Sequence, residues 1–556
     1  GNTESAYNNI YQATWSYAWH TAAYFQLAQL ALLKGNYEEA LAHLDRSVST
    51  NSRNIKAYNL KSALLRKMGQ PELALKISSA MMEYDPLDLG AMYEVYRAYS
   101  DLRKDEESAN VLSAIKSRMR DYIQSYLELS IDYANAGFWD DAIHVLSDPG
   151  LALKEPDNSF PLKYYYLASF WLHKGDTVKA TDLLRQAATK PSEYCFPFRL
   201  ESISILEAAI KMNPSDPKAS FYLGNLLFEL QPEKAIQNWE ISRSIDDSFP
   251  LVHRNLGMAY YKTNNDLPKA IASYEKAIGL NSKDQRLLYE ADLLQAFART
   301  NPEKRLKVLS DHHEVIANNN VADALSREVM LLVQLGRYDE ALKIAENNYF
   351  RQWEGVSKAY GSFVDAHLLR GLRQSDVGKQ KEALTDWLNA LKYPENMMVA
   401  ESYRGGRESQ VYYFIGTAYE KLGNQKKAKE MWELSANRKL YPQLSEIYFY
   451  RALSLKKLGR TTEATEIFDQ LIDQGMQRLE IPDIDFFAKF GEKESADDRR
   501  SEAHYLIGLG YLGKGMDKEA KPEFEKAVSL NINHVWAKEY LENAFSIRQN
   551  NTGTIY

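Results

Sequence analysis

The glycine-rich stretch GLGYLG, residues 508–513, has the spacing of loops that hold phosphate groups in nucleotide-binding proteins. Such loops need a strand before the glycines and a helix that opens after them. Here the glycines fall inside a helical pattern and at its end. The residue after Lys514 is Gly515, where a phosphate loop has Ser or Thr. We therefore interpret the stretch as a feature of helix packing and expect no nucleotide or other cofactor.

The remaining residues that commonly perform chemistry are few. His312 and His313 are adjacent, so they point about 100° apart on a helix, whereas a zinc site on one helix takes histidines four positions apart. Cys195 lies among aromatic residues in YCFPF, which is typical of a buried thiol and not of a nucleophile. No G-x-S-x-G motif occurs. We expect no metal site and no self-contained catalytic centre.

Composition and charge exclude several classes of protein. The 68 basic and 75 acidic residues give a net charge of −7, and no block of Lys and Arg could follow a phosphate backbone, which argues against nucleic acid as a partner. The longest apolar run, residues 164–172, is too short for a bilayer span, which needs about 20 residues. A single cysteine allows no internal disulfide. The cytoplasm is slightly favoured over the periplasm, and the compartment otherwise stays open.

The opening residues GNTESAYNN include neither an initiator Met nor a signal peptide. We expect a piece of a longer chain.

A helical repeat supplies the framework that must position any site. A glycine ends one helix and an alanine follows five positions later, near the start of the next. This spacing recurs at Gly35, Gly69, Gly137, Gly175, Gly336, Gly378, Gly423, Gly459 and Gly515. The alanines Ala40, Ala74, Ala109 and Ala142 are 34, 35 and 33 residues apart. A period of this length predicts stacked helix pairs.

The most regular units also contain a first-helix signature. Leu256, Gly257 and Tyr260 lead into Ala270 and Tyr274, and the same order recurs around Gly416 and Gly508. This pattern resembles the tetratricopeptide repeat. The resemblance implies an all-α solenoid, a right-handed superhelix of antiparallel helix pairs with a concave inner face. We expect about 12 to 14 pairs.

Breaks in the period divide the array. A Pro-rich link follows residue 190, and two long insertions, 391–410 and 476–501, interrupt the later repeats. We expect an N-terminal sub-array over 1–190, a central one over 191–365 and a C-terminal one over 366–556. Long loops in a tight array are typical of ligand loops or docking surfaces.

Several irregular segments resemble one bacterial family of undefined function, in which a β-sandwich like galactose mutarotase precedes a long tetratricopeptide array. The matching segments are YQATWSYAW (11–19), MEYDPLDLGAMYE (82–94), EYCFPFRLE (193–201), FYLGNLLFE (221–229), LVHRNLGMAYY (251–261), QWEG (352–355) and KYPEN (392–396). Only the C-terminal array of that family is covered. The chain departs from the family after Trp353, where Val356 and Ser357 replace further Gly and Glu.

The resemblance implies a carbohydrate-related setting, by analogy of fold alone. Sugar sites favour aromatic faces beside carboxylates and amides. The candidate ligand-binding residues of this kind are Tyr194, Arg199, Glu201, Trp353, Glu354, Tyr393, Glu395 and Asn396. The alternative is that Trp353 and Tyr393 fill gaps between repeats.

Three functions follow as hypotheses. The first is a non-catalytic scaffold whose concave face holds its own N-terminal domain, another protein or a peptide. The second is a carbohydrate site completed with a missing mutarotase-like domain, in which Glu201, Glu354 or Glu395 acts as acid or base. The full-length chain would then be an enzyme, whereas this piece alone would not.

The third hypothesis is capture of a peptide in the groove by Asn225 and Asn255, with Arg254 among the positions that face the groove. Phe221 stands where carboxylate-binding repeat proteins have Lys. Both Asn residues are equally consistent with solvating the groove.

Overall fold

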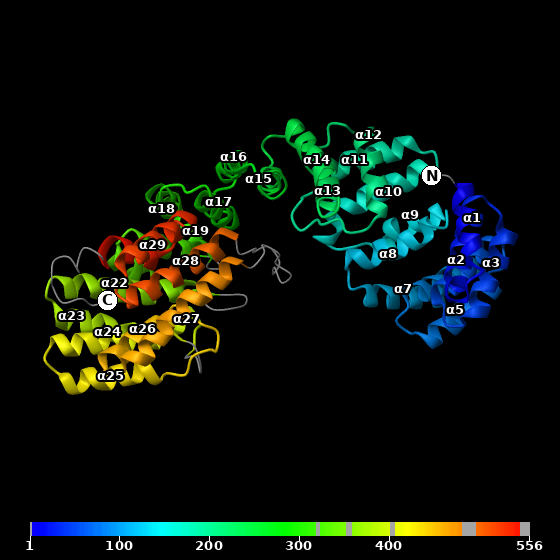
Figure 1. The fold of residues 1–556 in the computed structure, drawn as a ribbon. Helices are drawn as coiled ribbons and strands as arrows, with labels where there is room; N and C mark the ends of the chain where they lie inside the picture. Colours follow the sequence, from blue (N-terminus) through cyan, green and yellow to red (C-terminus); the bar gives the residue numbers. More distant parts are fainter. Residues whose placement is uncertain (1–2, 319–322, 352–357, 401–405, 481–495, 545–556) are drawn as a thin grey trace. The chain divides into compact units, whose positions relative to one another are not determined.

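The structure is a computed structural model that describes residues 3–318, 323–351, 358–400, 406–480 and 496–544. Within these ranges all regular secondary structure is helical and no strand occurs (Figure 1). The predicted all-α class is confirmed. Contacts divide the chain into two compact units, Gly1–Ser248 and Phe249–Tyr556, which are described separately below.

The first unit consists of helix pairs stacked in chain order, preceded by one extra helix. Its helices are α1 (Thr3–Ala13), α2 (Tyr17–Leu33), α3 (Tyr37–Thr50), α4 (Ile55–Lys67), α5 (Pro71–Tyr84), α6 (Leu89–Asp101), α7 (Asp105–Met119), α8 (Ile123–Ala134), α9 (Trp139–Ser147), the 3-10 turns η1 (Pro149–Leu151) and η2 (Asp157–Ser159), α10 (Pro161–His173), α11 (Thr177–Thr189), α12 (Glu201–Met212), α13 (Pro217–Leu227) and α14 (Pro232–Ile245). The predicted link after residue 190 lies inside this unit, and the division into three sub-arrays stays a prediction.

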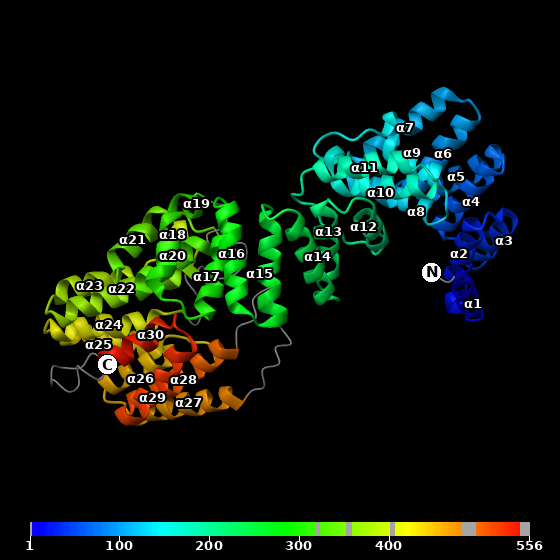
Figure 2. The same cartoon turned by 90° about the horizontal axis from the view of Figure 1, so that it is seen from above.

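The second unit repeats the arrangement (Figure 2). Its helices are α15 (Pro250–Asn264), α16 (Leu267–Leu280), α17 (Gln285–Phe297), α18 (Pro302–Asp311), α19 (His313–Ala317), α20 (Asp323–Gln334), α21 (Tyr338–Asn347), α22 (Lys358–Asp376), α23 (Gln380–Asn389), the 3-10 turn η3 (Glu395–Met397), α24 (Glu408–Lys421), α25 (Gln425–Asn437), α26 (Ile447–Lys457), α27 (Thr461–Glu480), α28 (Ala496–Gly513), α29 (Asp517–Leu530), α30 (Val535–Glu539) and the π-helical turn η4 (Tyr540–Ala544).

The turn inside each pair has the backbone that the glycine pattern predicts. All nine glycines of the repeated motif have φ between 73° and 82°, a left-handed conformation that ends the first helix of the pair. In three turns that lack the glycine, Arg103, Asn265 and Arg299 adopt the same conformation, with φ of 56°, 52° and 57°. The turn therefore keeps its left-handed backbone even where the residue carries a side chain, which raises the free energy of that conformation.

Small residues let the two helices of a pair approach closely. A Cβ atom on Gly224 would lie 2.5 Å from the Trp239 indole nitrogen, and one on Gly508 would lie 2.8 Å from the Phe524 ring. In α7 the period places Ala109 at the small-residue position, and this prediction is wrong by one position. Ser108 is the buried small residue, whereas Ala109 is exposed. These contacts between helix and aromatic ring form the core of each pair.

One pair is incomplete. Between α11 and α12 the chain runs through residues 190–200 without a helix, so α12 has no first helix before it and packs against α10 and α13. The extended segment therefore stands where a first helix would come. This is the largest departure from the repeat among the described residues of the first unit.

Candidate functional site

The segment 190–200, called here the link segment, exposes a dense set of large apolar side chains. Tyr194 is 89% exposed, Phe196 67%, Phe198 61% and Leu200 76%. Cys195, between two of them, is only 2% exposed. From Cys195 to Leu200 buried and more exposed positions alternate, as in an extended chain that presents one face to solvent, whereas Tyr194 lies in a turn with φ of 58°. Large apolar side chains gathered this closely on a surface commonly mark an interaction site.

The link segment is braced by the helices beneath it. Cys195 is buried beside Tyr222 of α13 and Leu162 of α10, and burial raises the pKa of its thiol to about 12. The Arg199 guanidinium forms an ion pair with Glu128 of α8 and lies 4.8 Å from the centre of the Phe198 ring. Since α8, α10 and α13 are first helices of their pairs, the segment lies on the first-helix side of the unit.

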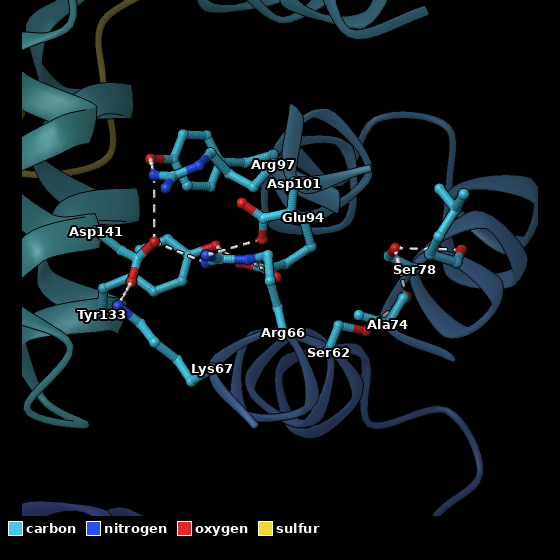
Figure 3. Close-up of polar contacts among 12 residues, drawn as sticks. Ser62, Arg66, Lys67, Ala74, Ser78, Glu94, Arg97, Asp101, Tyr133 and Asp141 are labelled. Atoms are coloured by element: carbon cyan, nitrogen blue, oxygen red, sulfur yellow. Dashed lines mark hydrogen bonds and ion pairs between the residues drawn. The ribbon is translucent and has the colours of Figure 1, made fainter. Parts of the chain in front are cut away.

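A second polar feature of the first unit is a buried ionic cluster (Figure 3). The Arg66 guanidinium of α4 lies between two carboxylates: its Nε is 3.2 Å from Glu94 of α6, and its Nη2 is 2.6 Å from Asp141 of α9. The Tyr133 hydroxyl of α8 donates a hydrogen bond of 2.6 Å to Glu94. Both carboxylate side chains are fully buried.

Further cations complete this cluster. Lys67 lies 2.7 Å and Arg97 3.3 Å from Asp141. Despite its burial, Asp141 has a pKa below the usual value because Arg66, Lys67 and Arg97 favour its charged form. Burial raises the pKa of Glu94. Since both carboxylates are sealed from solvent, the cluster cannot reach a substrate. It joins α4, α6, α8 and α9 by charge where an ordinary repeat uses apolar contacts.

In the predicted insertion 391–410, the residues described up to 400 make packing contacts. The Tyr393 ring stacks on Tyr360 at 5.4 Å between ring centres and its hydroxyl donates to Glu408. Burial, then the hydrogen bond to Glu408, raises the pKa of Tyr393. Asn396 donates to two backbone oxygens at the end of α21, Ala345 at 2.8 Å and Asn348 at 2.6 Å. Glu395 is exposed at the start of η3.

The predicted groove residues belong to different units. In the first unit, Asn225 accepts a hydrogen bond of 3.0 Å from the Trp239 indole. In the second, Arg254 holds Glu290 by two hydrogen bonds of 2.8 and 2.6 Å, while Asn255 is half-buried in α15. Asn225 and Arg254 thus take part in contacts between helices of their own units.

The other predicted site residues divide between the two units. Glu201 is exposed at the start of α12, beside Tyr194 and Arg199 in sequence. Trp353 and Glu354 lie outside the described residues. The structure therefore brings Tyr194, Arg199 and Glu201 into one segment of the first unit, and Tyr393, Glu395 and Asn396 into one loop of the second.

The motifs that resembled cofactor and metal sites have structural roles. Gly508, Gly510 and Gly513 lie inside α28, where a Cβ on Gly510 would meet Ile472 at 2.5 Å, which confirms that GLGYLG is a packing feature. His313 pairs with Glu328 at 2.8 Å, and His312 contacts the Val308 backbone oxygen. Among the described residues no group of three His, Cys, Asp or Glu side chains is arranged to hold a metal ion.

The inner side of the second unit is filled by the end of the described chain. Trp536 and Tyr540, in α30 and η4, contact the first helices of several earlier pairs, and Figure 2 shows α30 beside α24 and α26. The phenol oxygens of Tyr450 and Tyr540 are 2.6 Å apart. The part of the inner face that α22, α24 and α26 form is therefore occupied.

Two hollows also lie in the second unit. One of 820 Å³ lies along α25 between Lys426, Lys429 and Lys439, with Met431 and Leu434 at its apolar part. The other, of 380 Å³, lies between α16, α17 and α18 above the buried pair of Asp292 and Arg305.

Sequence comparisons identify the repeat. Profiles described as tetratricopeptide repeat match residues 21–54, 255–284, 409–435 and 501–534, and a second profile of that description matches 446–474. Together with the helix pairs and their glycine turns, these matches define a tetratricopeptide solenoid. Repeats of this type indicate a protein-interaction scaffold. No helix within the described ranges is long and apolar enough to cross a membrane.

Solved structures show similar helical arrays at low identity. Yeast Tom70 is 13% identical over 90% of this chain and 97% of its own, with a TM-score of 0.27. The Cut9-Hcn1 hetero-tetramer of the APC/C is 12% identical over 94% and 96%, with a TM-score of 0.25. YrrB, a tetratricopeptide-repeat protein with an unusual peptide-binding site, is 15% identical over 44% and 96%, with a TM-score of 0.17.

Sequence reasoning singled out Tyr194, Arg199 and Glu201 but missed Phe196, Phe198 and Leu200 beside them. The signal was present in YCFPF, where a buried Cys and a buried Pro alternate with the two Phe residues. It also missed Trp536 and Tyr540, whose spacing is that of an ordinary first helix. Their role depends on distant contacts.

Proposed function

We propose that the chain is a non-catalytic interaction scaffold whose first unit binds a partner protein through the link segment. The observation that carries the proposal is the exposure of Tyr194, Phe196, Phe198 and Leu200 within seven successive positions. Aromatic side chains supply large contact areas and are enriched among residues that dominate binding energy.

The bracing of the link segment supports the same function. Binding costs the entropy of any loop that must become ordered, so a surface held in place before contact binds more tightly. Here the buried Cys195 and the ion pair of Arg199 with Glu128 fix the backbone while the Phe rings stay exposed. The expected partner is therefore a protein segment with apolar side chains at its centre.

A carbohydrate function is the second candidate, and Tyr194 supports it. Its ring is 89% exposed beside Arg199 and Glu201 in sequence, a combination that suits stacking on a sugar face. In that version the chain is part of a larger carbohydrate-related bacterial protein, and the link segment contacts its own N-terminal domain. The Tyr393 ring and the Asn396 amide already make contacts within the second unit, so the proposal places the sugar contact at Tyr194.

The test is a selection of random peptides on the immobilised full chain, run in parallel on a Phe196→Ser/Phe198→Ser variant and on Val178→Ser. Val178 is 79% exposed on α11 of the same unit and serves as the matched control. We expect peptides rich in aromatic and aliphatic residues to enrich on the wild type and on Val178→Ser only. Enrichment of the same peptides on the double variant would contradict the proposal. A parallel glycan array on the wild type and Tyr194→Ala tests the carbohydrate candidate.

A further inference from the structure

The inner face of the second unit recognises the chain's own segment 532–544 by hydrogen bonds as well as by burial. The Trp536 indole Nε1 donates to Asp365 of α22 at 2.6 Å, and the Arg407 guanidinium pairs with the same carboxylate at 2.6 Å. The Trp536 ring stacks on Phe414 of α24 at 6.2 Å between ring centres. An indole nitrogen that meets a held carboxylate is a specific contact and not only an apolar one.

Polar contacts continue along the segment. Glu539 forms an ion pair with Arg373 of α22, and the Asn533 amide oxygen accepts from Arg305 of α18 at 2.8 Å. The backbone oxygen of Ile532 accepts from the Gln334 side chain of α20. The three contacts come from three different helices, α22, α18 and α20. Each of these helices thus provides a polar side chain that binds one residue of the segment.

The segment is an irregular helix. α30 continues directly as a π-helical turn over Tyr540–Ala544, at the end of the described residues, whereas the first helices of the other pairs are α-helical throughout. A π-helical turn is rare in proteins and is frequent at functional sites. The side chains of the groove hold the segment in place, together with Phe524 of α29, on which the Tyr540 ring stacks.

We propose that this groove is a helix-recognition site, filled here by the chain's own segment, which takes a helical segment of a partner protein with the same chemistry. That chemistry is a Trp, a carboxylate three positions later and a Tyr four positions later, as in Trp536, Glu539 and Tyr540. The spacing sets all three on one face of a helix. The site lies in the second unit and is independent of the link segment.

The specificity follows from the groove. Asp365 and Arg407 fix the indole, Arg373 selects the carboxylate, and the Tyr450 hydroxyl meets the phenol. A partner helix that lacks the Trp leaves Asp365 with Arg407 as its partner and without the hydrogen bond from the indole, and that loss disfavours binding. The chain's own segment competes because its tethering gives it a high effective concentration.

The test uses the full chain and a labelled synthetic peptide of residues 531–544, NINHVWAKEYLENA. In the chain variant Trp536→Ala/Tyr540→Ala the groove loses its tethered occupant. We expect this variant to bind the peptide at least about tenfold more tightly than the wild-type chain does, because the competing segment is weakened. The peptide with the Trp536→Ala change should not bind the variant.

Two controls make the result decisive. Leu388→Ala, on the exposed side of α23, should behave as the wild type, and adding Asp365→Ala to the double variant should abolish peptide binding.

Equal binding to the wild type and the double variant, or binding to neither, would overturn the proposal. So would loss of helical circular dichroism in the double variant, which would make the segment an integral part of the core. A wild-type dimer that the peptide dissociates would assign the groove to a second copy.

Discussion

The indole nitrogen of Trp536 lies 2.6 Å from a carboxylate oxygen of Asp365, 171 positions earlier in the chain. This hydrogen bond joins the last described helix to the inner face of the second unit. A partner must therefore displace α30 and η4 to reach that face. In the first unit, Phe196 and Phe198 are exposed without any such displacement.

Breaking the buried ionic cluster should destabilise the first unit strongly. Arg66→Ala removes the cation between Glu94 and Asp141, and a buried charge left without its partner costs about 3–5 kcal/mol. Lys56→Ala, which breaks the exposed pair with Asp132, should cost less than about 1 kcal/mol. Urea unfolding of the full chain followed by circular dichroism measures both. Equal losses would mean that the cluster does not carry the contacts between α4, α6 and α9.

A methyl group should have opposite effects at two glycines of the second unit. Gly508→Ala places a Cβ 2.8 Å from the Phe524 ring, and such overpacking costs about 1–3 kcal/mol. Gly279→Ala meets nothing within 4 Å inside α16 and should stabilise by about 0.5–1 kcal/mol. Thermal melting separates the two. A shift of the same sign for both variants would contradict the packing described for the helix pairs.

The first unit should lose stability in mild acid. Burial lowers the pKa of His43 and of His144. As pH falls below about 6.5 the unfolded chain takes up these protons first, so stability declines from there and the loss is complete below the folded pKa values. His43→Phe should make this decline smaller. Urea unfolding at about pH 7.5 and about pH 5.5 tests it, since an unchanged decline would mean that His43 does not contribute.

The thiol of Cys195 should be protected in the folded chain. Burial raises its pKa to about 12. At about pH 8 its thiolate fraction is therefore about 1,000-fold smaller than that of a free thiol. Reaction with a thiol reagent should be correspondingly slow in buffer and fast in concentrated urea. Rapid reaction in buffer would mean that the link segment detaches from α10 and α13.

The helix pairs could be predicted because each turn is encoded locally. A glycine at the end of the first helix and a small residue five positions later fix the turn and the close approach, as at Gly35 and Ala40. Where the glycine is replaced, as at Arg103, the local signal fails. The buried residue of the next helix, Ser108, was then assigned one position too late.

The candidate sites could be predicted only in part. The link segment stood out by composition, but which of its side chains are exposed depends on Tyr222 and Leu162, which bury Cys195. The role of Trp536 depends on the curvature accumulated over several pairs, which brings it to Asp365. Local sequence carries neither kind of information, because both are set by contacts between distant helices.

The most direct measurement is a titration of the tightest peptide selected on the full chain, followed by fluorescence anisotropy. It compares the wild type, Val178→Ser and Phe196→Ser/Phe198→Ser. Changes at exposed positions alter stability by no more than about 0.5 kcal/mol, so all three chains should unfold at similar urea concentrations. If the link segment is the docking surface, the wild type and Val178→Ser should bind the peptide with equal affinity. The double variant should then bind it at least about tenfold more weakly. Equal affinity for all three chains would contradict it.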